Sequence, residues 1–311
     1  MQRMILDTDP GIDDALALFL ALASPEIRLE AITTVSGNVD VELTTLNALS
    51  LLTLTGRTEI PVARGSGVPL VRERVHAAQV HGRNGLGDVS LPLPEIQPVA
   101  QHAVDLIIEK ILQAPGAITL VAIGPLTNLA LAVRCEPRIA GLVREVVVMG
   151  GALLVPGNVT PAAEFNIYAD PHAAHVVLHA GWPLRLVSLD TTLKVEMNRE
   201  QIARLTQPMS RVLAFCKEIL AYYLDIFAAP HGQSVFHMHD PLSLAAAFQP
   251  DLITWQPMYV DVELTGTLTL GETVGYGGND APPAPNVQAS VGVDSDRFMR
   301  MFLERMSNTY S

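Results

Sequence analysis

The chain has 311 residues, of which 49% are hydrophobic, so it can bury a sizeable core. Its formal net charge is -12 and its basic residues form no cluster larger than about a pair, which argues against a nucleic-acid polymer as a partner. Its two cysteines, Cys135 and Cys216, do not make a disulfide framework and indicate a reducing cytoplasm. We expect no signal peptide, because the first strand starts within a few residues of Met1, and no membrane span, because the apolar run 15–23 is too short.

The first part of the chain alternates between strand and helix patterns. Strands are predicted at 4–6, 29–35 and 60–65, where apolar or β-branched residues run together. Helical patterns at 13–23 and 41–55 lie between them. This alternation indicates a parallel sheet with right-handed crossovers.

A long segment, 66–97, then interrupts the alternation. Its stretch 76–88 is rich in glycine and polar residues, but the glycines lack the Gly-x-Gly-x-x-Gly spacing and no strand immediately precedes them. These features exclude a dinucleotide-binding fingerprint. A loop of this length is usually functional or disordered, and we expect 76–88 to act as a lid over a bound ligand.

The rest of the chain continues the α/β pattern and becomes mostly helical after residue 199. Helices are predicted at 98–113, from about 126, from 170, and at 199–206, 210–228, 240–247 and 294–306; strands are predicted at 118–123, 145–149, 184–189, 259–264 and 287–291. There is no repeat and no linker, so the chain 1–311 is interpreted as a single domain. Its predicted class is α/β and Rossmann-like, with a mostly parallel central sheet flanked by helices.

The stretch 4–14, Met-Ile-Leu-Asp-Thr-Asp-Pro-Gly-Ile-Asp-Asp, carries the strongest functional signal. It places Asp7, Asp9, Asp13 and Asp14 at one strand-to-helix turn. Like charges this close raise each other's pKa, and a hard cation such as Ca²⁺ or Mg²⁺ relieves the repulsion. Helix capping explains one or two of the aspartates but not four, so we interpret the stretch as a metal or catalytic site.

A second polar cluster is His-Met-His-Asp-Pro at 237–241. The spacing of His237 and His239 suits Zn²⁺, yet no further histidine pair or cysteine ligand stands at suitable spacing. Asp240 precedes Pro241, and we interpret it both as the N-cap of a helix and as a metal ligand.

A third cluster lies in the segment 157–166. Its side chains include Asn158, Glu164 and Asn166, whose donors and acceptors can recognise sugar hydroxyls. Turn formation and solvation explain the same residues when the segment is taken alone. All three clusters are expected at the carboxyl ends of the strands, where open α/β sheets bind ligands.

In their order and spacing, these motifs resemble the nucleoside hydrolases, the inosine-uridine-preferring family. The Asp-x-Asp-Pro-Gly-x-Asp-Asp pattern at 7–14 is specific by itself, whereas the other motifs are weak singly. They are Asn38, His81-Gly82 with Gly85-Leu-Gly87, Gly124–Asn128, Asn158–Asn166, His239-Asp240 and the closing helix Asp294–Met306. The resemblance spans the chain and implies the nucleoside hydrolase fold.

The resemblance implies hydrolysis of the N-glycosidic bond of a small-molecule ribonucleoside, giving ribose and a free purine or pyrimidine base. It implies a Ca²⁺ cofactor held by Asp9, Asp14, Asp240 and the main-chain carbonyl of Ile123. Asp9 would take a proton from water as general base, and His239 is the candidate acid for the departing base. It also suggests a homodimer or homotetramer.

The implied substrate contacts come from several segments. They are Asp13, Asn38, Asn158, Glu164, Asn166 and Asp240 at the ribose, Met149 in the pocket wall, and His81, Phe165, Tyr223 and Phe227 near the base. The pyrimidine-specific branch of the family carries Thr and Gln near the positions of Tyr223 and Phe227, and a Tyr near His231. The departure of this sequence argues against strict pyrimidine specificity. The remaining histidines, including His175 and His179, are interpreted as ordinary surface or packing residues.

Three alternatives stay open. The first is a pyrimidine-specific ribonucleoside hydrolase. The second is a phosphatase of the haloacid-dehalogenase type with Asp7 as nucleophile, which is disfavoured because Gly11 stands where Thr or Val is expected. The third is a non-enzymatic Ca²⁺-dependent nucleoside-binding protein, which would bind a nucleoside without releasing reducing sugar.

Overall fold

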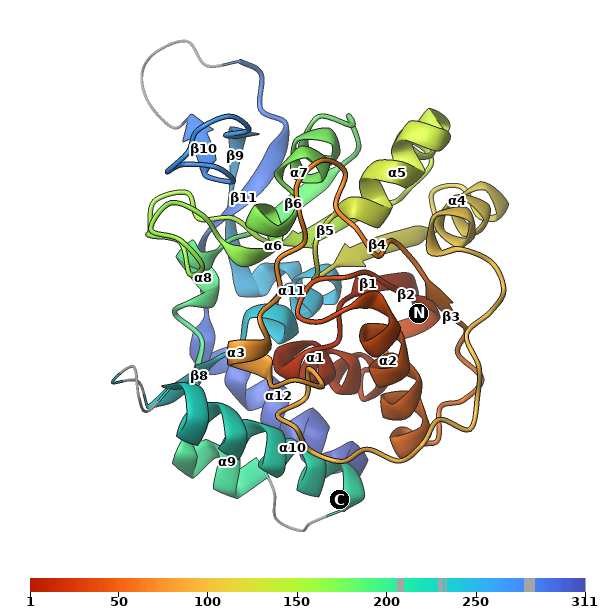
Figure 1. The fold of residues 1–311 in the computed structure, drawn as a ribbon, viewed down its shortest axis with the longest axis vertical. Coiled ribbons are helices and arrows are strands. Elements are labelled where there is room, and N and C mark those ends of the chain that lie inside the picture. The colour runs from red at the N-terminus through yellow and green to blue at the C-terminus, as the bar shows by residue number, and fades with distance from the viewer. Residues whose placement is uncertain (206–209, 229–231, 233, 277–282, 311) are drawn as a thin grey trace.

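A computed structural model describes residues 1–205, 210–228, 232, 234–276 and 283–310 of the chain (Figure 1). In this part of the chain a nine-stranded sheet has the order β10-β9-β11-β6-β5-β4-β1-β2-β3. The neighbours from β11 to β3 are parallel, and β9 and β10 continue the sheet antiparallel. The predicted α/β class with a mostly parallel central sheet is therefore confirmed.

The elements follow in chain order. The strands are β1 (Gln2–Thr8), β2 (Ile27–Thr34), β3 (Val62–Arg64), β4 (Ile118–Ala122), β5 (Glu145–Met149), β6 (Leu184–Val187), β7 (Glu196–Asn198), β8 (Val235–His237), β9 (Ile253–Val262), β10 (Thr273–Tyr276) and β11 (Val287–Val293). The α-helices are α1 (Ile12–Leu22), α2 (Val41–Thr55), α3 (Ala78–His81), α4 (Ala103–Gln113), α5 (Thr127–Cys135), α6 (Phe165–Ala169), α7 (Pro171–Leu178), α8 (Leu189–Thr192), α9 (Arg199–Leu205), α10 (Arg211–Tyr222), α11 (His239–Phe248) and α12 (Ser295–Tyr310). Short 3₁₀ turns cover Pro137–Gly141 and Pro250–Leu252, and a π-helical turn covers Tyr223–Ala228.

Two hydrophobic cores cover the two faces of the sheet, because successive side chains of a strand point to opposite faces. In β1, Met4 and Leu6 join the core shared with α1, α2, α10, α11 and α12. Ile5, between them, joins the core shared with α4, α5 and α7. Figure 1 shows these two helical layers on either side of the sheet. The buried runs of the central strands therefore hold the carboxyl ends of β1, β4 and β5 side by side.

Several predicted boundaries are corrected by pairing that lies far away in sequence. The helix predicted at 98–113 begins only at Ala103, because Val99 pairs with the edge strand β3. The strand predicted at 259–264 is the later part of β9, which pairs with β10. The two-stranded sheet of β7 and β8 was not predicted, since three-residue strands carry no clear periodicity.

The helices predicted at 210–228 and 240–247 differ from the observed structure. The pattern at 210–228 forms α10, which changes into the π-helical turn at Tyr223. Helix α11 starts at His239 with Met238 as N-cap, so Asp240 lies in the first turn and the N-cap interpretation of Asp240 is wrong. Among the described residues, no helix is both long and apolar enough to cross a membrane.

Candidate active site

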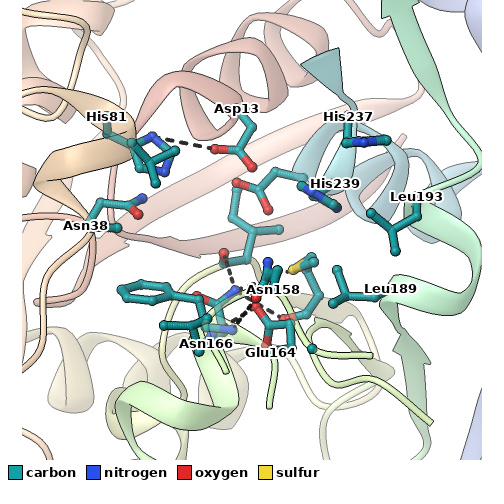
Figure 2. A pocket seen from close by; sticks show the side chains of 18 of the residues that line it. Asp13, Asn38, His81, Asn158, Glu164, Asn166, Leu189, Leu193, His237 and His239 are labelled. Carbon is teal, nitrogen blue, oxygen red and sulfur yellow. Dashed lines mark hydrogen bonds and ion pairs between the residues drawn. The ribbon is translucent and has the colours of Figure 1, made fainter. Parts of the chain in front are cut away.

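A cavity of about 550 Å³ opens where β1, β4 and β5 end, within the usual size range of ligand pockets. Figure 2 shows side chains from widely separated segments that point into this space. Most predicted site residues line the cavity: Asp13, Asn38, His81, Ile123, Met149, Asn158, Glu164, Phe165, Asn166, Tyr223, His239 and Asp240. Asp9 and Asp14 do not line it and are buried behind the wall at 1% exposure each.

Asp14 organises the turn between β1 and α1. Its carboxylate accepts hydrogen bonds from the amides of Asp9 (3.2 Å) and Gly11 (2.8 Å), from the Thr8 hydroxyl, and from the Asn38 side chain (3.1 Å). The contact with the Gly11 amide is half of a capping box at the start of α1. Asp14 therefore has a capping role, and this role holds the acidic turn in one shape.

Asp9 is held differently and keeps one oxygen without a partner. Its Oδ2 atom accepts the Asn38 amide at 2.7 Å, whereas its Oδ1 atom is buried and has no hydrogen-bond partner in the structure. Two glycines make room for this carboxylate: a Cβ added at Gly37 would lie 2.0 Å from Oδ2, and one at Gly124 would lie 2.4 Å from Oδ1. A buried, unpartnered carboxylate oxygen is costly unless a ligand uses it.

The acidic groups of two helices meet at the cavity. Asp13 and Asp14 from α1 and Asp240 from α11 each offer a carboxylate oxygen, and these oxygens lie within 4.8 Å of one another. Burial and the neighbouring carboxylates raise the pKa of Asp13 to about 8 and the pKa values of Asp9 and Asp240 well above the usual range. A bound cation would remove this penalty, because it favours the charged carboxylates.

Asp7 does not belong to the cavity. Its Oδ2 atom accepts hydrogen bonds from the Thr33 hydroxyl (2.6 Å) and the Asn128 side chain (2.8 Å), and the residue is fully buried. Burial raises its pKa to about 7. Of the four aspartates in the turn, Asp13 and Asp14 belong to the group of carboxylates at the cavity, and Asp7 does not. Full burial also denies Asp7 the access that a phosphatase nucleophile needs.

The polar segment that ends at α6 forms the opposite wall. Glu164 caps α6 and accepts the amides of Gly151, Asn166 and Ile167 at 2.8–3.1 Å, while burial raises its pKa. The Asn166 side chain donates to the carbonyls of Ile123 (3.0 Å) and Met149 (3.3 Å). These bonds connect the segment to the ends of β4 and β5.

Asn158 completes this wall by bonding within its own segment. Its Oδ1 atom accepts the amide of Phe165 at 2.9 Å. The bond fixes Asn158 beside the start of α6, and both residues line the cavity.

Three histidines line the cavity from other elements: His81, His237 and His239. His81, at the end of α3, accepts the Ile12 amide at Nδ1 (3.0 Å) and lies 4.0 Å from Asp13. The Nδ1 atom of His239 lies 2.7 Å from the Thr192 hydroxyl. Burial lowers the pKa of His81 to about 4, and burial with the neighbouring histidines lowers the pKa of His239 to about 3, so both rings are neutral near pH 7.

The remaining wall is apolar and was mostly missed from the sequence. Leu189, Leu193 and Phe236 line it, and the Tyr223 ring packs edge-on against Phe236 at 4.8 Å between centroids. Leu189 and Leu193 follow the end of β6, so the position of that strand end was the available signal. The side chain of Phe227, predicted near the base, and residue His231 lie outside the described part of the chain.

Comparisons with known proteins identify the family of this chain. The profile of the family "Inosine-uridine preferring nucleoside hydrolase" matches residues 4–300. The chain is 40% identical to the inosine-uridine preferring nucleoside hydrolase of Crithidia fasciculata, over 98% of this chain and 97% of that protein. It is 38% identical, with the same coverage, to a pyrimidine-specific ribonucleoside hydrolase of Enterobacter sp..

Solved structures show the same fold. A plant nucleoside hydrolase superposes with a TM-score of 0.94 at 37% identity, covering 98% of this chain and 99% of that chain. A purine-preferring ribonucleoside hydrolase from Gardnerella vaginalis superposes with a TM-score of 0.93 at 34% identity, covering 99% of both chains. The chain therefore belongs to the inosine-uridine-preferring nucleoside hydrolase family and is a hydrolase that acts on the N-glycosyl bond of a small nucleoside.

Proposed function

We propose that this hydrolase is Ca²⁺-dependent and cleaves both purine and pyrimidine ribonucleosides to ribose and the free base. The observation that carries the Ca²⁺ proposal is the unpartnered Oδ1 atom of Asp9 beside a buried group of carboxylates. Oxygen ligands suit a hard cation such as Ca²⁺. The residues present therefore fit this ion, and Asp9, Asp14, Asp240 and the carbonyl of Ile123 are its proposed ligands.

A Ca²⁺ ion in this position would supply positive charge that favours deprotonation of water next to the sugar. Asp9 is the proposed proton acceptor, because its Oδ1 atom has no other partner in the structure. The amide of Asn38 fixes the other oxygen and so directs Oδ1.

The ribose is proposed to lie between α1 and the wall at α6. Asp13, Asn38 and Asp240 face it from one side, and Asn158, Glu164 and Asn166 face it from the other. Glycosidic cleavage builds positive charge on the sugar ring, and buried carboxylates near the ring stabilise that charge. Met149 is the proposed floor of the ribose site.

The base is proposed to lie against His81, Phe165, Tyr223 and the apolar wall, with Phe227 nearby. An apolar wall distinguishes poorly between bases of different hydrogen-bonding pattern, which supports a broad preference. A strictly pyrimidine-specific enzyme is the second candidate, because a relative of that specificity is 38% identical.

His239 is the proposed acid for the departing base. It is neutral near pH 7, so it would act by donating the N–H of its imidazole, as neutral imidazoles can. If the Thr192 hydroxyl donates to Nδ1, the proton is held on Nε2. Thr192 is thus proposed to position His239.

The proposed setting is a cytoplasmic homodimer or homotetramer built from a single-domain chain. The nine-stranded sheet joins elements from both ends of the sequence, which supports the single domain. The subunit number would be measured by light scattering.

A nucleoside panel tests the function. Inosine, adenosine, uridine and cytidine are incubated with Ca²⁺-loaded protein. The reducing sugar released and the amount of nucleoside bound are both measured for each. Release from both purine and pyrimidine nucleosides is expected. Release from uridine and cytidine alone would establish the second candidate, and binding without reducing sugar would establish a non-enzymatic binding protein.

A further inference from the structure

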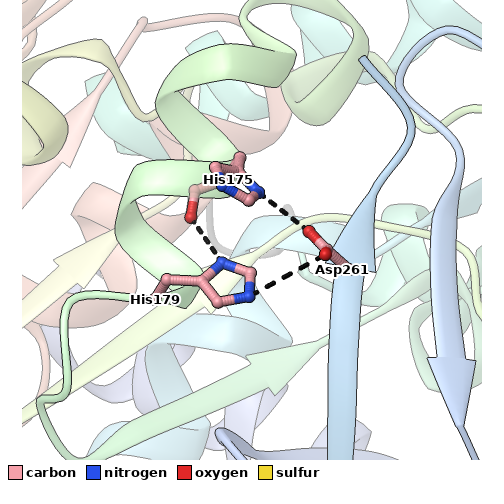
Figure 3. A group of neighbouring side chains, drawn as sticks. All are labelled: His175, His179 and Asp261. Atoms are coloured by element: carbon pink, nitrogen blue, oxygen red, sulfur yellow. Dashed lines mark hydrogen bonds and ion pairs between the residues drawn. The ribbon is translucent and has the colours of Figure 1, made fainter. Parts of the chain in front are cut away.

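A second cluster of possible metal ligands lies outside the active-site cavity. His175 and His179 stand four residues apart, at and just beyond the end of α7, and Asp261 faces them from β9 (Figure 3). The Nδ1 atom of His175 lies 2.8 Å from Oδ1 of Asp261, and Nε2 of His179 lies 3.9 Å from Oδ2. None of the three residues lines the active-site cavity.

The tertiary structure holds these groups together before any ion binds. Asp261 is 86 residues from His175 in sequence, so their contact depends on the packing of α7 against β9. That packing is apolar: Ala174 and Val177 of α7 share a buried core with Val260 and Val262 of β9. The centroids of the two imidazole rings lie 4.4 Å apart. The His175 carbonyl accepts a hydrogen bond from Nδ1 of His179.

The donor set differs in kind from that of the active site. Two imidazoles and one carboxylate suit Zn²⁺ and related transition-metal ions, whereas Ca²⁺ prefers oxygen alone. In a tetrahedral site with bonds of about 2.1 Å, two donor atoms are roughly 3.4 Å apart. The three donor atoms here already lie within 4.8 Å of one another, so side-chain rotations suffice to close the site.

The surroundings allow an ion to enter and offer an oxygen as a fourth ligand. The side chains are 30–39% exposed, and the Tyr259 hydroxyl lies 3.2 Å from Nε2 of His179.

We propose that His175, His179 and Asp261 form a binding site for a divalent transition-metal ion such as Zn²⁺. Tyr259 or water completes the coordination. The ion links α7 to β9, and it stabilises the folded chain because the unfolded chain does not hold the three ligands together. This site is independent of the proposed Ca²⁺ site, so the chain binds two ions of different chemical class.

Zinc titration of Ca²⁺-saturated protein tests the proposal. The protein is stripped with chelator and reloaded with excess Ca²⁺, and Zn²⁺ is then added against a competing chromophoric chelator. His175→Gln, His179→Gln and Asp261→Asn each remove one ligand from a partly exposed position. His172→Gln is the matched control, because His172 lies on the same helix outside the cluster.

The wild-type protein and His172→Gln are each expected to bind one additional Zn²⁺. The three ligand variants should bind this ion at least about tenfold more weakly, since even outer-shell partners of metal ligands contribute about 10–100-fold to metal affinity. Zn²⁺ should raise the melting temperature of the wild type but not of the variants. Co²⁺ should give a visible absorption band that the variants lack. Absence of Zn²⁺ binding, or equal binding by the three ligand variants and the wild type, would overturn the proposal.

Discussion

The Gly124→Ala substitution probes how closely the fold encloses Asp9. The added Cβ would lie 2.4 Å from Oδ1 of Asp9, whereas ordinary contact begins at 3.4 Å, so the carboxylate must retreat by about 1 Å. A displacement of this size at a reacting group can lower the rate by about 10²-fold. Overpacking should also lower the free energy of unfolding by about 1–3 kcal/mol.

Steady-state kinetics with inosine at saturating Ca²⁺ measure this effect. Gly141→Ala is the control, because a Cβ there meets no atom within 4 Å and should leave kcat/KM unchanged. Asp9→Asn removes the base itself and should cost about 10²–10⁴-fold, with the fold intact by circular dichroism. Near-normal turnover of Gly124→Ala would refute the reasoning that the position of Asp9 Oδ1 limits the reaction.

Three further predictions concern the acidic cluster, His239 and the loop. The raised pKa of Asp13, about 8 against 3.8 for an ordinary aspartate, means that the metal-free folded state keeps a proton that the unfolded chain loses. Its melting temperature should therefore fall as the pH rises from about 4 to 8, and Ca²⁺ should abolish the fall; a flat profile without metal would contradict this. His239→Ala should cut inosine hydrolysis by about 10²–10⁴-fold but p-nitrophenyl riboside hydrolysis much less. Thr192→Val should likewise slow inosine hydrolysis more than p-nitrophenyl riboside hydrolysis. Equal losses for both substrates would exclude His239 as the leaving-group acid. Amide exchange in 76–88 should slow when a ribose-like inhibitor binds, and unchanged exchange at saturation would make the segment a passive surface loop.

Local patterns predicted the centre of the fold well. The apolar runs at 4–6, 118–123 and 145–149 are buried on both faces and form β1, β4 and β5, so composition alone identified them. Elements that depend on distant partners were harder to predict. The helix starting at Ala103 is shortened by pairing at Val99, and the π-helical turn after α10 has no signal in the pattern.

The site residues also divide into those that local sequence predicts and those that depend on distant contacts. The aspartates near β1 and the His-Asp pair at 239–240 could be found from the sequence, because each is a close group of titratable residues at the end of a predicted element. The contact of His239 with Thr192 spans 47 residues, and the sequence gives no sign of it. Burial also could not be read from the sequence, and it changes the chemistry: it makes His239 neutral and places Asp7 beneath the site instead of in it.

Metal content and metal-dependent turnover, measured on the same protein, test the central claim most directly. Protein purified without chelator should contain about one Ca²⁺ per chain in the oxygen-lined site. Removal of that ion should abolish release of reducing sugar from inosine, and Ca²⁺ alone should restore it. Full turnover after complete removal of metal, or restoration by Zn²⁺ and not by Ca²⁺, would contradict the account.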